Sequence, residues 1–359
     1  MHIVLRNSNL MAFKYWILDW QIWYRAPYAI QKLVFQSIAD VVGTTENANF
    51  NIKRLEEAGL VQAAFDMFKD KDYLFPEKLG LPLISVLQVV QKPPSSKDLQ
   101  LILQYLVATH SSPSIGQNET LVVNLSQMMT PRKVKKVISF DTPSLYNNQS
   151  SKSVPPTPST PHSISDSVGL RILVVEMLLD FFKDYAGCVE AFAELCSIEL
   201  LFALLRVEST KVRILLLQVL DFYLMNATLL AKFKEMKGFE LLGKQLSTLS
   251  ISEDLFGALF QLLLGRSALP KPSVPSSPLR SYFVGQIQDA KLQHPDAIST
   301  ILSVCCVSAP EYQHYVIKTL HSIFLQNDKI KQQMIDDGKR DFLCGEAIWY
   351  LEFDQQSMI

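Results

Sequence analysis

The feature that most constrains the fold is a long succession of amphipathic helical segments. In the segment 29–42, apolar residues recur at the spacing of one helix face: Ile30, Leu33, Val34, Ile38 and Val41. Segments of the same kind occupy 79–92 and 96–110, and they follow one another with short connections from 169 to 327. The sequence therefore predicts an all-α fold.

A weak internal repeat refines this prediction. The segments 55–68, 233–246 and 334–348 each contain an apolar residue, a short polar stretch, a glycine and a new apolar helix, with the glycines at Gly59, Gly238 and Gly338. A glycine after a helix accepts the left-handed conformation that turns one helix into the next. This order of helix, glycine turn and helix is typical of armadillo and HEAT arrays, so we predict an armadillo/HEAT-like α-solenoid. An irregular helical domain is the alternative, because glycine ends many helices.

Two segments rich in Ser, Thr and Pro interrupt the helices. Residues 139–169 contain too few apolar groups to offset the entropy of ordering, so we predict a disordered linker there. It separates a helical block at 1–138 from a second block at 170–359, which contains a short flexible loop at 267–281. Candidate phosphorylation sites, each followed by proline, lie in these segments: Thr142, Thr157, Thr160 and Ser277.

The charge balance argues against a polyanionic partner. The chain has 34 basic and 35 acidic residues, a net charge of −1, so no global field favours nucleic acid. A local basic patch stands before the linker, formed by Arg132, Lys133, Lys135 and Lys136. At about 1 kcal/mol per charge near an anionic surface, these residues give at most peripheral membrane attachment. A solvated flank beside the linker is the alternative interpretation.

The residue types that perform chemistry form no recognisable motif. The five cysteines have no zinc-binding spacing and are predicted to be reduced, mostly buried thiols of a cytosolic protein. The six histidines include no HxxxH or HExxH pair, and no nucleophile elbow, P-loop or dinucleotide-binding loop occurs. We therefore expect no catalytic site, metal or cofactor.

An aromatic cluster stands near the N-terminus, within a segment interrupted by charges and too polar to be a membrane span or signal peptide. Trp16, Trp20, Trp23 and Tyr24 lie at helical spacing. Such stripes are usually core, so we predict that these residues form the inner face of the first packed helix. A groove for a peptide or ligand is the alternative. An interfacial membrane anchor is disfavoured because no basic face accompanies the aromatic residues.

Three stretches resemble the lysosomal-trafficking regulator family, large cytosolic proteins that end in a BEACH domain and WD repeats. They are 17–27 with 49–65 (NFNIKRLEEAGLVQAAF), 99–114 (LQLILQYLVATHSSPS) and 212–266. Their order matches that of the family. The resemblance implies an armadillo-like region N-terminal to the BEACH domain and a role in sizing, fusing or dividing lysosomes and related organelles. It also implies endolysosomal or vesicle-fusion proteins as partners, a cytoplasmic location and peripheral contact with endolysosomal membranes.

The chain departs from this family because it contains neither a BEACH domain nor WD repeats, so we expect a fragment or an incomplete gene model. The resemblance carries over no catalytic residue, and the predicted function is that of a non-catalytic scaffold. The alternatives are a neurobeachin-like BEACH protein, an unrelated armadillo adaptor, a peripheral lipid-binding helical module or an enzyme. A basic face would favour lipid binding, whereas a closed pocket with converging titratable groups would favour an enzyme.

Overall fold

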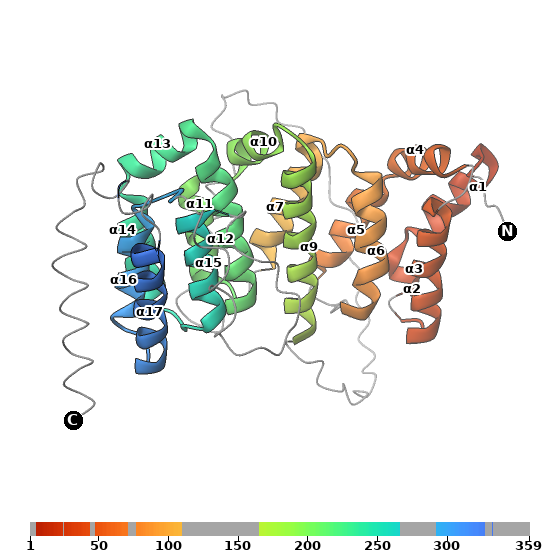
Figure 1. Cartoon of the computed structure of the whole chain (residues 1–359). Helices are drawn as coiled ribbons and strands as arrows, with labels where there is room; N and C mark the ends of the chain where they lie inside the picture. Colours follow the sequence, from red (N-terminus) through yellow and green to blue (C-terminus); the bar gives the residue numbers. More distant parts are fainter. Residues whose placement is uncertain are drawn as a thin grey trace, which may run out of the picture. The chain divides into compact units, whose positions relative to one another are not determined.

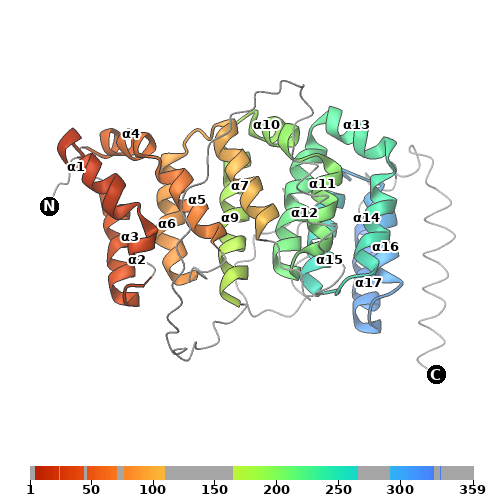
Figure 2. The ribbon, with the colours of Figure 1, turned by 180° about the vertical axis from the view of Figure 1, so that it is seen from behind.

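The computed structural model describes residues 5–23, 25–43, 47–70, 77–109, 165–265, 292–326 and 332. Every regular element in these ranges is a helix, which confirms the predicted all-α class (Figures 1 and 2). The chain divides into two compact units, Met1–Met177 and Leu178–Ile359, with the division inside one long helix.

Unit 1 is built from short helices followed by longer ones. Its elements are α1 (Asn7–Ala12), the π-helical turn η1 (Phe13–Ile17), α2 (Trp20–Trp23), α3 (Tyr28–Val42), α4 (Ala48–Ala58), α5 (Leu60–Lys69), α6 (Glu77–Val90), α7 (Ser96–Ala108) and the first half of α9 (Ser165–Asp184). Helix α3 packs against α4 and α6, and α5 packs against α7. The core contains the fully buried side chains of Phe35, Ile38, Leu55 and Phe65.

The turn between α4 and α5 has the predicted glycine geometry. Gly59 has a φ of 83°, in the left-handed region, and its N–H donates to the carbonyl oxygen of Glu56 at 2.9 Å. A residue with a Cβ is strained in this conformation, whereas glycine is not. The glycine turn predicted at this position is therefore confirmed.

Helix α9 corrects the predicted linker. The helix begins at Ser165, so residues 165–169 are helical rather than disordered, and 139–164 lie outside the described residues. The polar composition up to Ser167 hides the start of the helix in the sequence. Leu170 and Arg171 are buried, and Arg171 hydrogen-bonds to α7, so tertiary contacts stabilise this part of α9.

Unit 2 continues the pattern of consecutive helices. After the second half of α9 come α10 (Cys188–Leu195), α11 (Ile198–Val207), α12 (Thr210–Met225), α13 (Ala227–Glu235), α14 (Gly238–Ser247), α15 (Glu253–Leu264), α16 (Ala297–Cys305) and α17 (Pro310–Gln326). Helix α12 packs against α10, α11, α13 and α15, while α14 packs against α16. This consecutive packing of helices is the α-solenoid organisation that the sequence predicts.

Polar side chains tie neighbouring helices of unit 2 through backbone carbonyls. Gln245 Nε2 donates to the carbonyl oxygen of Phe202 at 2.8 Å, and Thr300 Oγ1 donates to that of Phe239 at 2.7 Å. Each such bond contributes on the order of 1 kcal/mol to stability. They also fix the register between helices, which apolar contacts alone leave less defined.

The glycine predicted to turn the chain between α13 and α14 has a different role. Lys237 takes the left-handed conformation there, with a φ of 54°, while Gly238 is the first residue of α14. A Cβ on Gly238 would lie 2.6 Å from three ring atoms of Phe233. Close approach to that ring, and not a positive φ, requires glycine at this position. Gly338 lies outside the described residues.

A candidate interaction groove in unit 2

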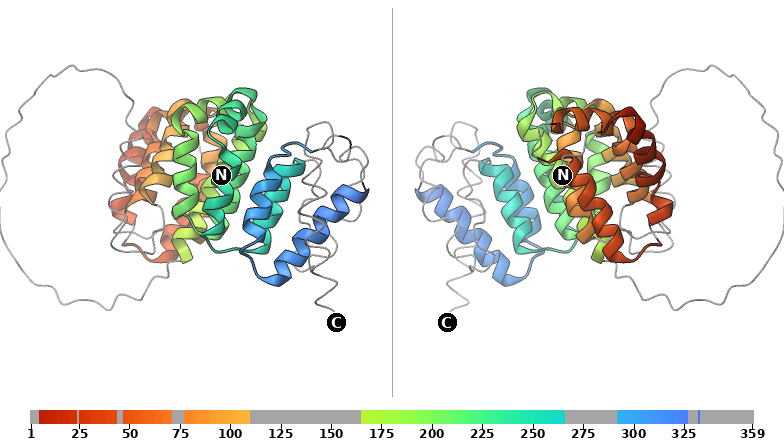
Figure 3. Two further views of the ribbon diagram at one scale, coloured as in Figure 1. Left: turned by 90° about the vertical axis from the view of Figure 1, so that its left-hand side faces the viewer. Right: turned by 90° about the vertical axis from the view of Figure 1, so that its right-hand side faces the viewer.

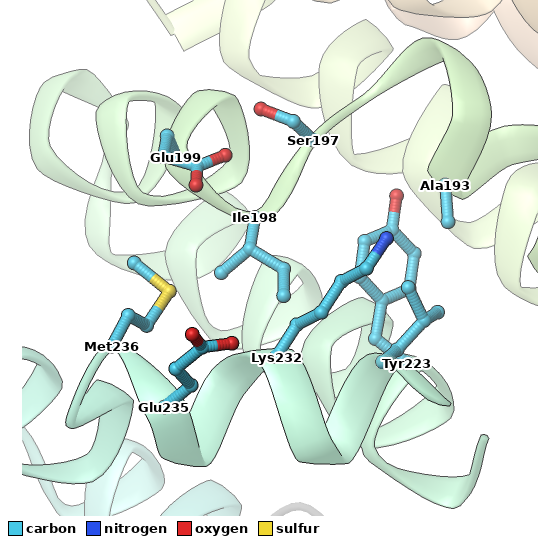
Figure 4. Close-up of a pocket in the computed structure, with 9 residues that line it drawn as sticks. Ala193, Ser197, Ile198, Glu199, Tyr223, Lys232, Glu235 and Met236 are labelled. Atoms are coloured by element: carbon cyan, nitrogen blue, oxygen red, sulfur yellow. The ribbon is translucent and has the colours of Figure 1, made fainter. Parts of the chain in front are cut away.

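Four consecutive helices of unit 2 surround a groove of about 460 Å³ (Figure 4). Helix α10 contributes its last turn, α11 its first turn, α12 its C-terminal half and α13 one face. The lining residues are Ala193, Ser197, Ile198, Glu199, Tyr223, Leu229, Lys232, Glu235 and Met236. We call this site the α10–α13 groove.

The first wall is the junction between α10 and α11. Ser197 is the N-cap of α11, and its Oγ accepts a hydrogen bond from the N–H of Leu200 at 3.3 Å. The cap satisfies one of the free N–H groups that begin every helix. Glu199 lies in the first turn, where the helix dipole favours a carboxylate. The junction therefore presents Ile198 and Glu199 to the groove from a fixed backbone.

Tyr223 joins this wall to α12. Its side chain is fully buried, and its hydroxyl donates to the carbonyl oxygen of Cys196 at 2.9 Å. The ring also lies edge-on to Phe192, with ring centroids 6.5 Å apart. Burial raises the pKa of Tyr223 well above its ordinary value of 10, so the phenol stays protonated. Tyr223 is thus a structural support of the groove.

The opposite wall is α13, which leaves α12 at an angle of 108°. Asn226 begins it: the side-chain Oδ1 accepts from the N–H groups of Thr228 at 3.0 Å and Leu229 at 3.2 Å. The Nδ2 group of Asn226 donates to Glu190 Oε1 on α10 at 2.9 Å. One asparagine therefore both caps α13 and connects it to the far wall.

The lining combines charge with apolar surface. Glu199 and Glu235 lie on opposite sides of Met236 and Ile198, while Lys232 extends towards Tyr223 and Ala193 (Figure 4). The lining thus carries two carboxylates and one ammonium group, so a ligand with a basic group beside apolar groups would be complementary.

Thiols near the groove are unsuited to nucleophilic chemistry. Burial raises the pKa of Cys196 to about 12, and burial together with the charge of Glu190 raises that of Cys188 to about 11. A thiolate is the reactive form of cysteine, so both groups are held in the unreactive form. Cys188, Cys196 and Cys305 are buried, as predicted, while Cys306 is exposed. Cys344 lies outside the described residues.

Metal ligands do not gather within the described ranges. No group there of three or more His, Cys, Asp or Glu residues is placed to hold an ion. His294 is buried against Phe239, with ring centroids 6.2 Å apart. Burial and the nearby charge of Lys234 lower its pKa to about 4, although Asp296 opposes the shift.

The aromatic cluster at the N-terminus is not a single buried stripe. Trp16 lies on η1 and is 70% exposed, so the prediction that it belongs to the core is wrong. Trp20 is partly buried and stacks on Phe35, with ring centroids 5.4 Å apart. A break at Leu18 and Asp19 separates η1 from α2, which turns Trp16 away from the face that packs. Tyr24 lies outside the described residues.

The other sites predicted from sequence fall in undescribed parts of the chain. This holds for the basic patch of Arg132, Lys133, Lys135 and Lys136, and for Thr142, Thr157, Thr160 and Ser277. The α10–α13 groove was not predicted. The only sequence signal near it is the family resemblance across 212–266, which includes Tyr223 and all of α13.

No single helix within the described ranges is long and apolar enough to cross a membrane. The bent pair of α12 and α13 reaches the required length and composition only when the two helices are taken together.

Comparison with known families agrees with the helical architecture. No solved structure matches the chain. Residues 163–339, just under half of the chain, match the family model of the neurobeachin/BDCP DUF4704 α-solenoid region. The α10–α13 groove lies inside the matched residues. Residues 163–339 are thus similar to the α-solenoid region of neurobeachin and BDCP. This similarity supports a helical region of the BEACH-family type.

Proposed function

We propose that this chain is a non-catalytic α-solenoid scaffold of a BEACH-family vesicle-trafficking protein, and that it binds a protein partner through the α10–α13 groove. The observation that carries the proposal is the position of the groove within the matched residues 163–339. Solenoids bind partners through surfaces formed by successive helices, and four successive helices form this groove.

The chemistry of the groove suits peptide recognition. Ile198, Leu229 and Met236 offer apolar contact, and Glu199 and Glu235 select a basic group beside it. Methionine adapts its shape to different apolar ligands, which is useful at a binding surface. The partner segment is therefore an extended peptide with a Lys or Arg between apolar residues.

We also propose that the groove has no catalytic activity, because the hydroxyl and thiol groups beside it are unreactive. The hydroxyl of Tyr223 is committed to the carbonyl of Cys196, and the thiol of Cys196 has a raised pKa. Neither group is poised to attack a substrate or to exchange a proton near neutral pH.

Two family assignments are compatible with this function. The stretches described above resemble lysosomal-trafficking regulators, which implies a role in the size, fusion or fission of lysosomes and related organelles. The match to the neurobeachin/BDCP region favours a neurobeachin-like trafficking protein at least as well. In either case, we propose partners from the endolysosomal or vesicle-fusion machinery, no nucleic-acid partner and a cytoplasmic location with peripheral contact to endolysosomal membranes.

The test is capture of partners from cell lysate by the full chain, followed by quantitative mass spectrometry. The groove variant is Glu199→Lys with Glu235→Lys, which reverses both carboxylates. The matched control is Glu240→Lys with Glu311→Lys, because these exposed glutamates lie in the first turns of α14 and α17. Both variants change the net charge equally.

We expect the wild type and the control to recover endolysosomal or vesicle-fusion proteins. The groove variant should recover at least fivefold less of the same proteins. Equal recovery by all three proteins would contradict partner binding through the groove. Recovery of lysosomal trafficking proteins would favour the lysosomal-trafficking regulator assignment. Recovery of proteins from other vesicle systems would favour the neurobeachin-like assignment.

A further inference from the structure

Several large apolar side chains of α1, η1, α2 and α3 are exposed. Six of them are about half exposed or more: Met11, Tyr15, Trp16, Ile22, Tyr28 and Leu33. Trp16 and Leu33 reach 70% and 63% exposure. Single exposed apolar residues are normal on a protein, whereas a group of them marks a contact surface. We call these six residues the N-terminal aromatic surface.

The same segment has a net positive charge, whereas the rest of the chain has a net negative charge. From Leu5 to Leu33 there are four basic residues, Arg6, Lys14, Arg25 and Lys32, against Asp19 alone, which gives +3. The whole chain carries −1. Lys14 and Lys32 are exposed, and the Nζ atom of Lys14 lies 5.9 Å from the ring centroid of Tyr15. The exposed aromatic residues therefore belong to a segment of net positive charge with exposed lysines.

The backbone beneath this surface is held by indole hydrogen bonds. Trp23 Nε1 donates to the carbonyl oxygen of Trp16 at 2.8 Å, and Trp20 Nε1 donates to that of Ala63 on α5, also at 2.8 Å. These bonds fix η1 and α2 while the side chain of Trp16 stays exposed. The elements α1, η1, α2 and α3 lie together at one end of unit 1, at the front of the right-hand view in Figure 3.

We propose that the N-terminal aromatic surface binds the interfacial region of an anionic phospholipid membrane. Tyrosine and tryptophan are favoured at the level of the headgroups, apolar side chains enter the boundary of the acyl chains, and basic residues contact anionic headgroups. Each basic residue near such a surface strengthens binding by roughly fivefold. The surface combines all three residue classes on fixed backbone.

A membrane explains the arrangement better than a protein partner does. Protein interfaces exclude charge from their apolar centre and place it at the rim. Along the sequence, Lys14 lies between Met11 and Tyr15, and Lys32 directly precedes Leu33. All five side chains are exposed, so charged and apolar residues alternate in this segment. A lipid interface accepts this mixture because long basic side chains extend to the headgroups while apolar neighbours insert.

The experiment is flotation of the full chain with vesicles of phosphatidylcholine alone or with about a third phosphatidylserine. The apolar variant is Trp16→Ala with Leu33→Ser, and the charge variant is Lys14→Gln with Lys32→Gln. The matched control is Met225→Ser with Val307→Ser, two exposed apolar residues of unit 2. A fourth variant replaces Arg132, Lys133, Lys135 and Lys136 by Gln, because that basic patch is another source of attraction.

We expect the wild type, the control and the fourth variant to bind the anionic vesicles better than the neutral ones. The apolar variant should bind on the order of tenfold more weakly, and the charge variant about 25-fold more weakly, at about fivefold per lysine. Brominated lipids should quench the tryptophan fluorescence of the wild type, with a smaller effect on the apolar variant.

Three results would overturn the proposal. The first is equal or absent binding to both vesicle types. The second is loss of vesicle binding only in the fourth variant. The third is self-association of the wild type without vesicle binding, abolished by Trp16→Ala with Leu33→Ser, which would assign the surface to a second copy of the chain. Circular dichroism of each variant shows that the helices are retained.

Discussion

Arg171 on α9 donates a hydrogen bond from Nη2 to the carbonyl oxygen of Leu106 on α7 at 3.0 Å, across 65 residues of sequence. Its other terminal nitrogen, Nη1, donates to Thr109 Oγ1, and the guanidinium lies 5.8 Å from the ring centroid of Tyr105. The side chain is fully buried. Burial lowers the pKa of Arg171 to about 10, which still leaves the group charged at neutral pH. One side chain therefore connects α9 to α7, two helices that are separated in the sequence by the segment 110–164.

Arg213 repeats the arrangement in unit 2. Its Nε donates to the carbonyl oxygen of Leu205 at 2.9 Å, and its Nη2 donates to that of Glu208 at 2.6 Å. In each unit, a buried arginine in the first two turns of a long helix thus donates to carbonyl oxygens at the C-terminal end of a preceding helix. Those carbonyls have no partner within their own helix, so the arginine satisfies them.

Replacing Arg171 by lysine should destabilise the protein although the charge is kept. A lysine has one nitrogen and cannot reach both Leu106 and Thr109 in the fork geometry of a guanidinium. We expect a loss of about 2–4 kcal/mol in the free energy of unfolding, measured by urea denaturation. Arg206→Lys, at an exposed position of α11, is the control and should change the free energy by less than about 0.5 kcal/mol. Equal stability of both variants would show that the fork geometry is unimportant.

Gly238 and Gly257 form a matched pair for a packing test. Gly238→Ala places a Cβ against the ring of Phe233, which is fully buried and stacked on Phe202 with ring centroids 5.9 Å apart. Because the ring has no room to move, we expect a loss of about 1–3 kcal/mol. Gly257→Ala meets nothing within 4 Å and should be neutral or stabilise α15 by about 0.5–1 kcal/mol. Thermal unfolding of both variants checks this contrast, and a stable Gly238→Ala variant would refute it.

His294 should make stability fall in mild acid. The folded protein holds its pKa at about 4, below the unfolded value near 6.5, because burial and Lys234 disfavour the charged ring. The unfolded chain therefore binds the proton first. Stability is fully present above about pH 6.5 and is lost as the pH falls towards 4. Between pH 7 and pH 5, the contribution of His294 should fall by about 2 kcal/mol.

The variant that checks this is His294→Asn, which has no titratable ring. Its free energy of unfolding, relative to the wild type, should improve between pH 7 and pH 5, whatever its stability at pH 7. An unchanged slope in His294→Asn would refute the assignment.

Alanine variants of Asn226 and Ser252 distinguish an effect on partner binding from an effect on stability. Both are N-caps that accept backbone hydrogen bonds, Asn226 for α13 and Ser252 for α15, where Oγ accepts from the N–H of Leu255 at 3.4 Å. Replacing either by alanine should cost about 1 kcal/mol. Only Asn226→Ala should also weaken partner capture, because α13 is a wall of the groove. Equal capture by both variants would indicate that the position of α13 does not matter for binding.

The sequence predicts the helices better than it predicts the surfaces they create. Helical periodicity and the glycine at position 59 are local properties, so the all-α class and the turn after α4 follow from them. The exposure of Trp16 does not follow, because it depends on a break at Leu18 and Asp19 that helical spacing conceals. The early start of α9 is likewise hidden, since burial of Arg171 against a helix 65 residues away outweighs the polar composition before it.

The α10–α13 groove cannot be predicted from sequence patterns for a similar reason. Its walls meet because α13 turns by 108° from α12 and because Tyr223 contacts the carbonyl of Cys196. Both are tertiary relationships between residues that are ordinary members of a solenoid sequence. The family resemblance covers the segment without indicating that its residues line a common space.

Site-specific photo-cross-linking in cells tests whether the α10–α13 groove holds a partner protein. A cross-linking amino acid at Met236 lies in the groove, and one at Leu241 lies on the exposed side of α14 as the control. We predict adducts with endolysosomal or vesicle-fusion proteins from position 236, and their absence when Glu199→Lys and Glu235→Lys are added. Adducts that are the same from both positions, or that persist in the groove variant, would contradict the account.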